Sequence, residues 1–344
     1  MSEAATARSG GAAWLNVALT LLLTGVLFNL FCLVSGSAPI TVYRALVSTT
    51  IASPYGLAQL LFKATPYLFL GVAAALAFSA GQFNIGLEGQ LLVGSLAMGI
   101  AGVMLPPGTP GLIAVALLCL VAMLAGAAWA MIPAFLKHRF SAPEVMTSIM
   151  TNFIAALAAG LLLKPFAVSE STHTAAVPKA FMFAAIDRLI PATKGAQLST
   201  AFLLGLLVVA GAHWLLFRTR FGFEWRAFGA NPRAARLYGV ETRRLMFLSF
   251  AISGALAGLA ACVYVLGAKG FHEDGFSGGI GFLALGVALL AKNRPLLVVP
   301  AALLFGLISY GSLAINAHVP KEMTDILTAV IMAAAVITSA KAKR

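Results

Sequence analysis

Charged residues are scarce in this sequence of 344 residues. Only 10% of the residues are Asp, Glu, Lys or Arg, whereas 60% are hydrophobic and the mean hydropathy is +0.95. A soluble domain carries about 25% charged residues, so this composition excludes a protein with a fully wetted surface. The sequence therefore predicts an integral membrane protein.

Cysteines and catalytic motifs are also rare. Cys32, Cys119 and Cys262 each lie inside an apolar run, which argues against a disulfide framework or a metal site. No Gly-Lys dipeptide occurs, so the phosphate-binding loop of ATPases is missing. The stretch GFSGG (275–279) matches a hydrolase nucleophile pattern, but that elbow requires a preceding strand, and a polar Gly-rich turn is the simpler interpretation. We therefore expect neither enzyme activity nor a bound cofactor in this chain.

Long apolar runs are what the sequence does contain. Runs near 20 residues predict α-helices, because the strands of a membrane barrel would alternate over about ten residues. We expect an all-α integral membrane protein with about ten transmembrane helices in a single domain over residues 1–344. The expected spans are 12–34, 60–80, 86–105, 111–136, 144–164, 198–217, 245–267, 279–291, 295–316 and 323–340. The eighth has only 13 residues, which indicates strong tilt, an earlier start or a broken helix.

The basic residues predict the orientation. With the N terminus inside and the sides alternating, 15 of the 23 Lys and Arg residues fall on the inside, and the outer eight include Lys63 and Lys321. Cytoplasmic loops carry such an excess, so both termini are expected in the cytoplasm. A cleaved signal peptide is the alternative at the N terminus, because WLNVALTLLLTGVLFNLFCLV precedes SGSA. That run exceeds the roughly 7–15 apolar residues of a signal peptide.

Two loops carry patterns of their own. The outer loop, 165–197, contains FMFAAIDRLI, whose near-helical apolar spacing predicts a segment on the membrane surface. The inner loop, 218–244, contains seven arginines. Within it, Asn231 as N-cap, Pro232 at the first helical position and Gly239 beyond the end predict a helix over 232–238. This helix carries Arg233 and Arg236 on one face. It is either a surface helix in a loop whose positive charge only sets the topology, or a helix that docks into a cytoplasmic partner.

The polar stretch GQFNIGLEGQ (81–90) lies between two apolar runs. Irregular backbone at membrane depth occurs where it faces protein or a cavity, and an ionisable residue at that depth is a functional candidate. We therefore expect a substrate path along Gln82, Asn84, Glu88 and Gln90, together with Asn152 of the span 144–164. The alternative is a tight cytoplasmic turn with Glu88 in water. The Gly-rich segment GFSGGIGFLALG in the second half of the chain is loosely comparable with GQFNIGLEGQ in the first half. Two Gly-interrupted segments in corresponding places of the two halves can mark a transport path at the membrane midplane.

Five motifs resemble those of a known family. AGQFNIGLEGQ is similar to the G-x-F-N-I-G-x-E-G-Q signature of permease subunits of bacterial ABC importers, in the branch with nucleoside and simple-sugar permeases related to ribose and branched-chain amino acid permeases. The resemblance covers about residues 60 to 310 and continues in EVMTSIMTNFIA (144–155), FGFEWRAFGANPRAARLYGV (221–240), SGALAGLAA (253–261) and GVALLAKNRP (286–295). It implies one permease transmembrane domain in the inner membrane of a bacterial cell.

This resemblance also implies partners. The inner loop would contain a coupling helix that seats in a cytoplasmic ABC ATPase subunit, with Arg226, Asn231, Arg233 and Arg236 transmitting the motion. ATP would be bound by that partner. A second permease subunit, identical or different, and an extracytoplasmic solute-binding protein would complete the complex. No nucleic acid partner is expected.

The expected cargo is a nucleoside. Its neutral hydroxyls and base edges match the donors and acceptors of side-chain amides. A simple sugar and a branched-chain amino acid are the alternatives, and an ion-coupled secondary transporter would explain the spans but not the arginine-rich loop. This chain departs from the family pattern at two places. Such permeases commonly have an Asp after Gly281-Phe282 and a Gly in the stretch after Pro295, whereas this chain has Leu283 and LLVV. If that Asp contacts the substrate in relatives, the ligand of this protein differs from theirs.

Overall fold

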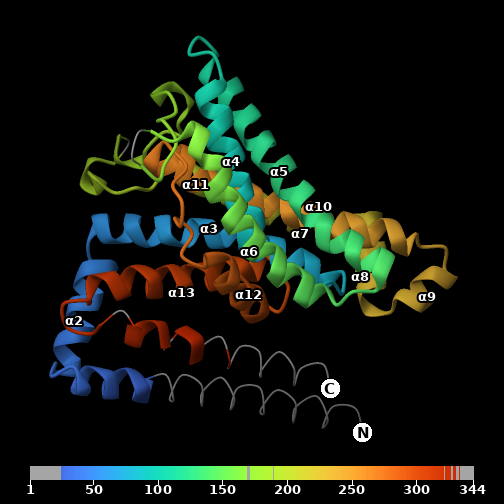
Figure 1. Cartoon of the computed structure of the whole chain (residues 1–344). Helices are drawn as coiled ribbons and strands as arrows, with labels where there is room; N and C mark the ends of the chain where they lie inside the picture. The colour runs from blue at the N-terminus through green and yellow to red at the C-terminus, as the bar shows by residue number, and fades with distance from the viewer. Residues whose placement is uncertain are drawn as a thin grey trace, which may run out of the picture.

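The chain folds into a bundle of α-helices (Figure 1). This computed structural model describes residues 25–168, 171–188, 190–320, 322–326, 328–330 and 333, and within them no β-strand forms. Helix α1 contributes Gly25–Val34 to these residues. The helices that follow are α2 (Pro39–Thr50), α3 (Pro54–Ser79), α4 (Leu87–Met104), α5 (Gly111–Phe140), α6 (Glu144–Leu163), α7 (Ala201–Arg218), α8 (Arg220–Ala230), α9 (Pro232–Leu237), α10 (Thr242–Leu259), α11 (Cys262–Tyr264), α12 (Ile280–Leu290) and α13 (Pro295–Ala314).

Seven helices in the described part of the chain are long and apolar enough to cross a membrane. The count rises to eight if Gly25–Val34 and α2, which meet at a bend of 109°, form one span. The predicted spans between residues 60 and 267 and at 295–316 each match one of the seven, whereas α12 has only 11 residues. Much of the predicted first and last spans, 12–34 and 323–340, and the proposed signal peptide lie outside the described residues.

The region before α3 differs from the sequence prediction. Residues 35–59 were expected as an outer loop, but they contain α2 and the first turns of α3. Helix α3 begins early because the Ser53 hydroxyl accepts a hydrogen bond from the Gly56 N–H at 2.9 Å, and Pro54 occupies the first helical position. Lys63, expected at the outer end of the span 60–80, therefore lies in the third turn of α3.

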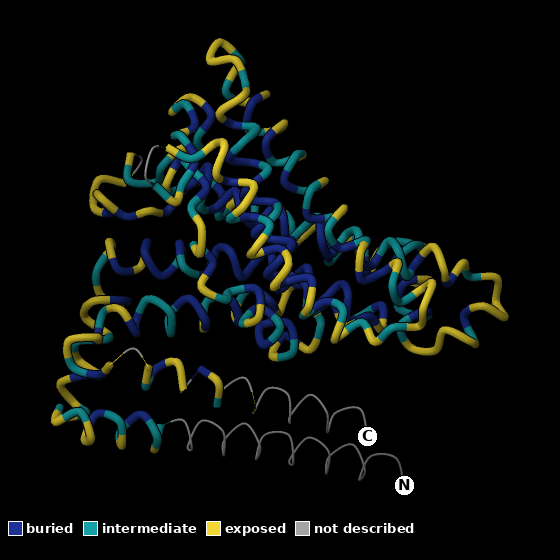
Figure 2. The backbone as a smooth tube through the Cα atoms, in the orientation of Figure 1, coloured by how far each residue is buried: buried dark blue, intermediate teal, exposed yellow. Residues whose placement is uncertain are grey.

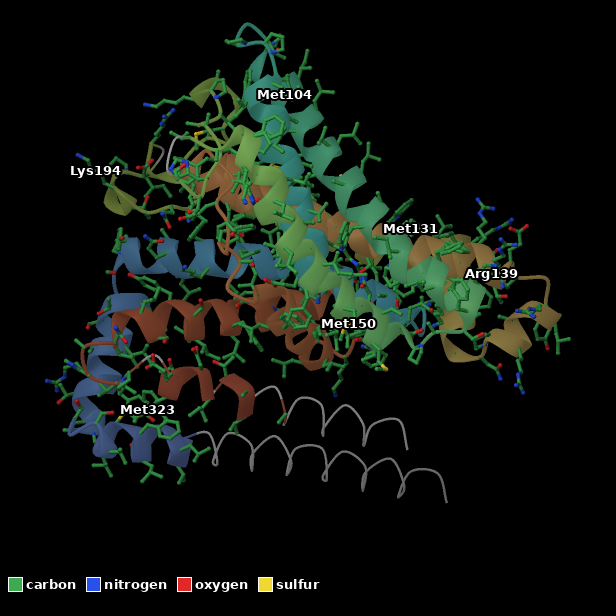
Figure 3. All side chains as sticks on the ribbon, viewed as in Figure 1. Met104, Met131, Arg139, Met150, Lys194 and Met323 are labelled. Atoms are coloured by element: carbon green, nitrogen blue, oxygen red, sulfur yellow. The ribbon has the colours of Figure 1, made fainter. Side chains whose placement is uncertain are left out.

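Helix α3 forms the centre of the bundle. Of its most apolar 18-residue window, 89% is buried, against 28% for α5, α6 and α7. Figure 2 shows the buried positions concentrated along the middle of the molecule. Apolar side chains such as Met104 and Met150 project outward from α4 and α6 (Figure 3), where they are exposed. Apolar outer faces are what lipid-facing helices require.

Small residues hold α5 and α10 together. The motif GALAG (254–258) lies in α10, and a Cβ atom on Gly254 would lie only 2.5 Å from the Gly126 carbonyl oxygen of α5. On the other side, Gly258 contacts Gly94 of α4, where a Cβ atom would again lie 2.5 Å from a backbone atom. Close approach of backbones at small residues is a common way of joining helices in membranes.

The outer loop packs against the chain instead of lying flat. Phe181, expected on the membrane surface, is completely buried, and the segment forms short 3₁₀ turns at Lys179–Phe181 and Ile186–Arg188. Backbone hydrogen bonds from Thr174 to His272 (2.9 Å) and from Val177 to Gly270 (2.7 Å) fix it to the segment after α11. The surface-helix prediction was wrong because these long-range backbone pairs compete with local helix formation. Leu189 lies outside the described residues.

Candidate substrate path and coupling surface

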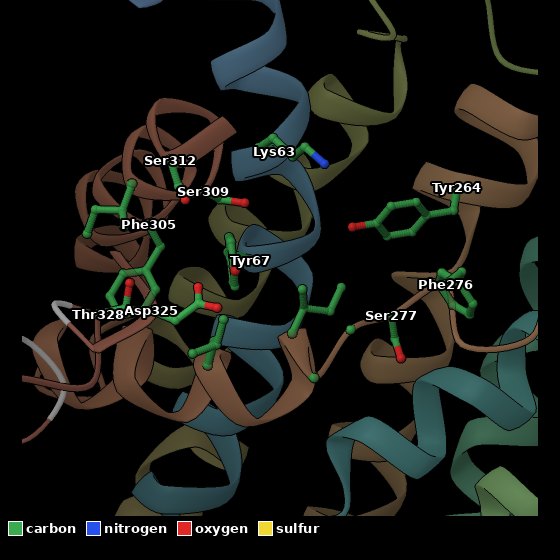
Figure 4. Close-up of a pocket in the computed structure, with 15 residues that line it drawn as sticks. Lys63, Tyr67, Tyr264, Phe276, Ser277, Phe305, Ser309, Ser312, Asp325 and Thr328 are labelled. Atoms are coloured by element: carbon green, nitrogen blue, oxygen red, sulfur yellow. The ribbon is translucent and has the colours of Figure 1, made fainter. Parts of the chain in front are cut away.

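A cavity of about 430 Å³ opens between α3, α11, α12 and α13. Figure 4 shows the Tyr264 side chain reaching from α11 toward α3, and the Lys63 side chain reaching the other way. Aromatic rings, hydroxyl groups and two charged groups share the lining. The lining residues are Lys63, Tyr67, Tyr264, Phe276, Ser277, Gly278, Gly279, Ile280, Leu283, Phe305, Ile308, Ser309, Ser312, Asp325 and Thr328.

One wall of the cavity is formed by the non-helical stretch between α11 and α12 and by the start of α12. After α11 the chain makes a π-helical turn, Val265–Lys269, and then runs without a helix until α12 begins at Ile280. Gly278 and Gly279 have φ angles of +55° and +82°, which favour glycine because it lacks a Cβ atom. Non-helical backbone within a membrane protein is tolerated where it lines a cavity. The short eighth span is a single helix of 11 residues, α12, so neither an earlier start nor a break within it is found.

Glu88 holds this wall from the side of α4. Its carboxylate accepts hydrogen bonds from the Ser277 hydroxyl, from the Gly279 N–H at 3.2 Å and from the Gly281 N–H at 2.7 Å. The two backbone groups belong to the start of α12, where N–H groups lack partners within the helix and favour an anion. Ser277 therefore donates to Glu88 and has no nucleophile elbow around it, because the segment before it forms no strand.

Asn84 and Gln90 form a reciprocal pair. Each side-chain amide donates to the carbonyl oxygen of the other at 3.0 Å, and Asn84 also donates to the Ser253 hydroxyl of α10 at 2.9 Å. Asn152 of α6 adds a second clamp, since it accepts from the Gly89 N–H at 2.9 Å and donates to the Ile85 carbonyl at 3.0 Å. These buried amides satisfy backbone groups that the irregular segment leaves open.

Gln82 is bound near the other end of the segment. It accepts a hydrogen bond from Lys137 at 2.6 Å, and Lys137 forms an ion pair with Glu144. Glu144 in turn accepts from the Phe83 N–H at 3.1 Å. The turn between α5 and α6 is thus joined to the segment that follows α3.

None of the five residues expected along the substrate path lines the cavity itself. Gln82, Asn84, Glu88, Gln90 and Asn152 are all at least nine-tenths buried and are bonded to protein groups. The structure places them in separate hydrogen-bonded groups along the segment 81–90, and of these only Glu88 bonds to the cavity wall. Whether cargo reaches any of them stays a prediction. The alternative of Glu88 in water is wrong, since its exposed fraction is 7%.

The cavity residues themselves were missed in the sequence. Tyr67, Tyr264 and Phe305 lie in apolar runs and resemble ordinary core residues there. Two signals were available: Lys63 is ionisable within an apolar span, and Leu283 occupies the position where the resemblance leads one to expect an Asp. Both residues line the cavity.

The arginine-rich loop contains two helices. The predicted helix 232–238 is confirmed as α9, and the Asn231 side chain caps it by accepting from the Arg233 and Ala234 N–H groups at 3.0 and 3.1 Å. Helix α8 was not expected. At the free tip, Leu237 and Tyr238 are 88% and 89% exposed.

The four arginine-loop residues expected to contact an ATPase lie along these helices. Arg226 of α8 stacks on Phe217, with its guanidinium carbon 4.7 Å from the ring centroid. Arg236 donates to the Thr242 hydroxyl at 3.1 Å, whereas Arg233 and Asn231 are exposed. The surface therefore combines cations with two exposed apolar side chains at one end of the bundle (Figure 1).

Comparison with known proteins matches residues 56–336 to the family described as branched-chain amino acid transport system, permease component. The chain is 34% identical over 306 residues to the guanosine ABC transporter permease of Bacillus subtilis, covering 88% of this chain and 87% of that protein. It is 32% identical over 303 residues to the glucose ABC transporter permease of Haloferax volcanii, covering 86% and 79%. It is 28% identical over 304 residues to the nucleoside ABC transporter permease of Lactococcus lactis, covering 86% and 83%.

No solved structure matches this chain. The family match covers most of the sequence, and two of these relatives exceed 30% identity over 79% and 87% of their lengths. The apolar helices agree with a multi-pass membrane protein. The chain therefore belongs to the permease family of the branched-chain amino acid transport systems and is the permease subunit of an ABC transporter.

Proposed function

We propose that this permease subunit imports nucleosides. The observation that carries the proposal is the lining of the cavity, where Tyr67, Tyr264, Phe276 and Phe305 present rings and three serines present hydroxyl groups. A nucleobase has a flat apolar face that suits aromatic side chains. Ribose hydroxyls and base edges need neutral donors and acceptors. The names of the Bacillus and Lactococcus relatives support the same cargo.

The size of the cavity agrees with such a cargo. Its volume of about 430 Å³ lies within the range of roughly 300–1,000 Å³ that is usual for small-molecule sites. Asp325 can accept hydrogen bonds from ribose hydroxyls, because an ionised carboxylate is an acceptor only. Glu88 shapes the path by holding its wall. Gln82, Asn84, Gln90 and Asn152 hold the segment 81–90, which carries Glu88.

The transporter contains several further subunits in this proposal. A cytoplasmic ABC ATPase binds and hydrolyses ATP, and it receives α9 with Arg226, Asn231, Arg233 and Arg236. A second permease chain, identical or different, completes the path, and an extracytoplasmic binding protein delivers the nucleoside. The permease is a single domain of about ten spans in the bacterial inner membrane, with both termini in the cytoplasm. The excess of Lys and Arg in the inner loops supports this orientation.

The transport cycle follows from these contacts. Closure of the ATPase subunits on ATP pulls the two coupling helices together and opens the cavity toward the binding protein. Hydrolysis then returns the permease to the state that releases cargo into the cytoplasm. A weak site is sufficient here, because the binding protein captures the cargo outside.

Two observations favour other cargo. The Haloferax relative is named as a glucose permease, and sugars also hydrogen-bond serine and carboxylate groups. Lys63 and Asp325 place both charge signs in one cavity, as a zwitterionic amino acid would require. The four aromatic rings argue for the nucleoside, because an aliphatic amino acid offers no flat face for them.

Competition during uptake separates these cargoes. Cells that express the permease with its proposed ATPase, second permease and binding protein are given labelled guanosine. We expect uptake that excess unlabelled nucleosides abolish and that excess glucose, ribose or leucine leaves unchanged. Uptake of labelled glucose, ribose or leucine that excess nucleoside does not inhibit would refute the nucleoside assignment and leave the permease family intact.

A further inference from the structure

The polar segment 81–90 contacts two parts of the molecule that the transport cycle must connect. One is α8, which precedes the helix proposed to dock into the ATPase. The other is the non-helical wall of the cavity. The contacts at both ends involve buried backbone groups, and the segment between them is clamped.

At the first end, α8 is packed directly on the end of α3. The Trp225 indole, which is 1% exposed, donates to the Leu76 carbonyl at 3.0 Å and to the Ser79 hydroxyl at 3.1 Å. One turn later Gly229 lies against the backbone, since a Cβ atom there would come within 2.9 Å of the Ala80 carbonyl carbon. Helix α8 therefore cannot shift relative to the end of α3 without breaking buried hydrogen bonds.

Between the two ends the segment has little freedom. Gly81, with φ of +70°, turns the chain directly beside Gly229, and a Cβ atom on it would lie 3.1 Å from the Gly229 carbonyl oxygen. The Asn84–Gln90 pair and the two bonds of Asn152 then fix the backbone from residue 84 to 90. Because these amides are buried, loss of one partner leaves a polar group without a bond, at a cost of about 1–3 kcal/mol.

At the second end only Glu88 bonds to the cavity wall from this segment. Its carboxylate holds Ser277, Gly279 and Gly281. Two glycines with positive φ angles, Gly270 and Gly275, precede this held stretch. Such a stretch can take up a backbone change more easily than a helix can, as hinges do. The backbone can therefore change conformation at Gly275, just before Ser277, whereas Ser277, Gly279 and Gly281 are held by Glu88.

We propose that Glu88 is a positioning residue that moves the cavity wall at Ser277–Gly281 together with α8. The proposal rests on the proposed function, in which α9 follows the ATPase. Motion of α8 displaces the end of α3 and the segment 81–90 as one body. Glu88 then draws the start of α12 with it, and the glycine-rich stretch absorbs the difference from the outer loop. Cargo does not touch Glu88 in this scheme.

The coupling of ATP hydrolysis to uptake tests the proposal. The complete complex is reconstituted in proteoliposomes with Glu88→Gln, which keeps size but puts an amide donor opposite a backbone N–H, or with Ser277→Ala. We expect nucleoside uptake per ATP hydrolysed to fall by about tenfold or more for Glu88→Gln and by less for Ser277→Ala. For Glu88→Gln, ATP hydrolysis and the amount of assembled complex should stay at the levels of the unsubstituted protein. Ser249→Ala, a buried serine bonded only within α10, is the matched control and should change neither quantity.

A second measurement needs no cargo. The three native cysteines are replaced by Ala, Leu283→Cys is introduced in the cavity wall, and its labelling by a water-soluble thiol reagent is followed with and without a non-hydrolysable ATP analogue. We expect nucleotide to change the labelling rate when Glu88 is present and to leave it unchanged with Glu88→Gln. If Glu88→Gln does not assemble, Ser277→Ala is used and should weaken the response.

Two results would overturn the positioning role. One is a parallel loss of uptake and ATP hydrolysis, and the other is a nucleotide response of Leu283→Cys that survives Glu88→Gln. Failure of the unsubstituted complex to take up nucleosides would instead refute the proposed cargo. The labelling measurement would still decide the role of Glu88 in that case.

Discussion

The contact between α8 and α3 predicts opposite effects for two identical substitutions. Gly229 and Gly211 both lie within helices, α8 and α7, and both are changed to Ala. A Cβ atom on Gly211 meets nothing within 4 Å, whereas one on Gly229 comes within 2.9 Å of the Ala80 carbonyl carbon and closer still to the Ser79 carbonyl oxygen. Ordinary van der Waals contact starts at 3.4 Å, so α8 and the end of α3 must separate by at least 0.5 Å in the Gly229 variant.

These distances give the sign and the magnitude of the change in stability for each variant. Overpacking against backbone costs about 1–3 kcal/mol, and Trp225 loses its hydrogen-bond geometry as α8 moves away. Gly211→Ala should instead stabilise by about 0.4–1 kcal/mol, because Ala restricts the unfolded chain and suits a helix. We expect Gly229→Ala to lower the Tm of the purified complex and its uptake per ATP hydrolysed, and Gly211→Ala to raise Tm or leave it unchanged.

Thermal unfolding in detergent and uptake in proteoliposomes measure the two effects. Equal Tm values for the two variants would refute the packing argument. A lower Tm for Gly229→Ala with normal uptake per ATP would keep the packing but refute the transmission of motion through α8. Because both variants add one methyl group within a helix, differences in helix propensity cannot account for opposite signs.

Three further predictions follow from the surfaces described above. A membrane-impermeant thiol reagent should label Ser171→Cys from outside and Ala230→Cys only after the membrane is opened; labelling of Ala230→Cys in intact cells would reverse the orientation. The double substitution Arg233→Glu with Arg236→Glu should leave membrane insertion intact but reduce co-purification with the ATPase or uncouple ATP hydrolysis from uptake. Transport at the wild-type level would show that the arginines of this loop serve only to orient the chain in the membrane. Asp325→Asn should reduce the preference for guanosine over 2′-deoxyguanosine by about tenfold, since one charged acceptor is worth roughly 1.5–3 kcal/mol; an unchanged preference in competition assays would exclude contact with the ribose.

Local signals in the sequence predicted local structure. The helix α9 was predictable because Asn231, Pro232 and Gly239 are adjacent in sequence and each acts on the backbone beside it. The spans α4, α5 and α6 agree with the predicted ranges within a few residues, because lipid exposure requires continuous apolar runs. Helix α2 was missed since its 12 residues, with Arg44 and several hydroxyl side chains, do not form a long apolar run.

The candidate site depends on contacts that no local pattern contains. Glu88 was correctly singled out as a buried charge, but its partner Ser277 lies 189 residues further along the chain. Tyr67, Tyr264 and Phe305 come from three different helices, and their arrangement around one cavity follows only from the packing of the bundle. The sequence thus predicted which polar groups are unusual, whereas the structure shows that Glu88 bonds to the cavity wall and that the other four bond within and around the segment 81–90.

The central claim is that ATP hydrolysis drives nucleoside import through this chain. Its most direct test is guanosine accumulation in proteoliposomes that contain the permease chains and the ATPase, with the binding protein outside. The account predicts accumulation only when ATP is present on the side of α9, with no effect of a proton or sodium gradient. Accumulation driven by an ion gradient without ATP would contradict it and would favour a secondary transporter.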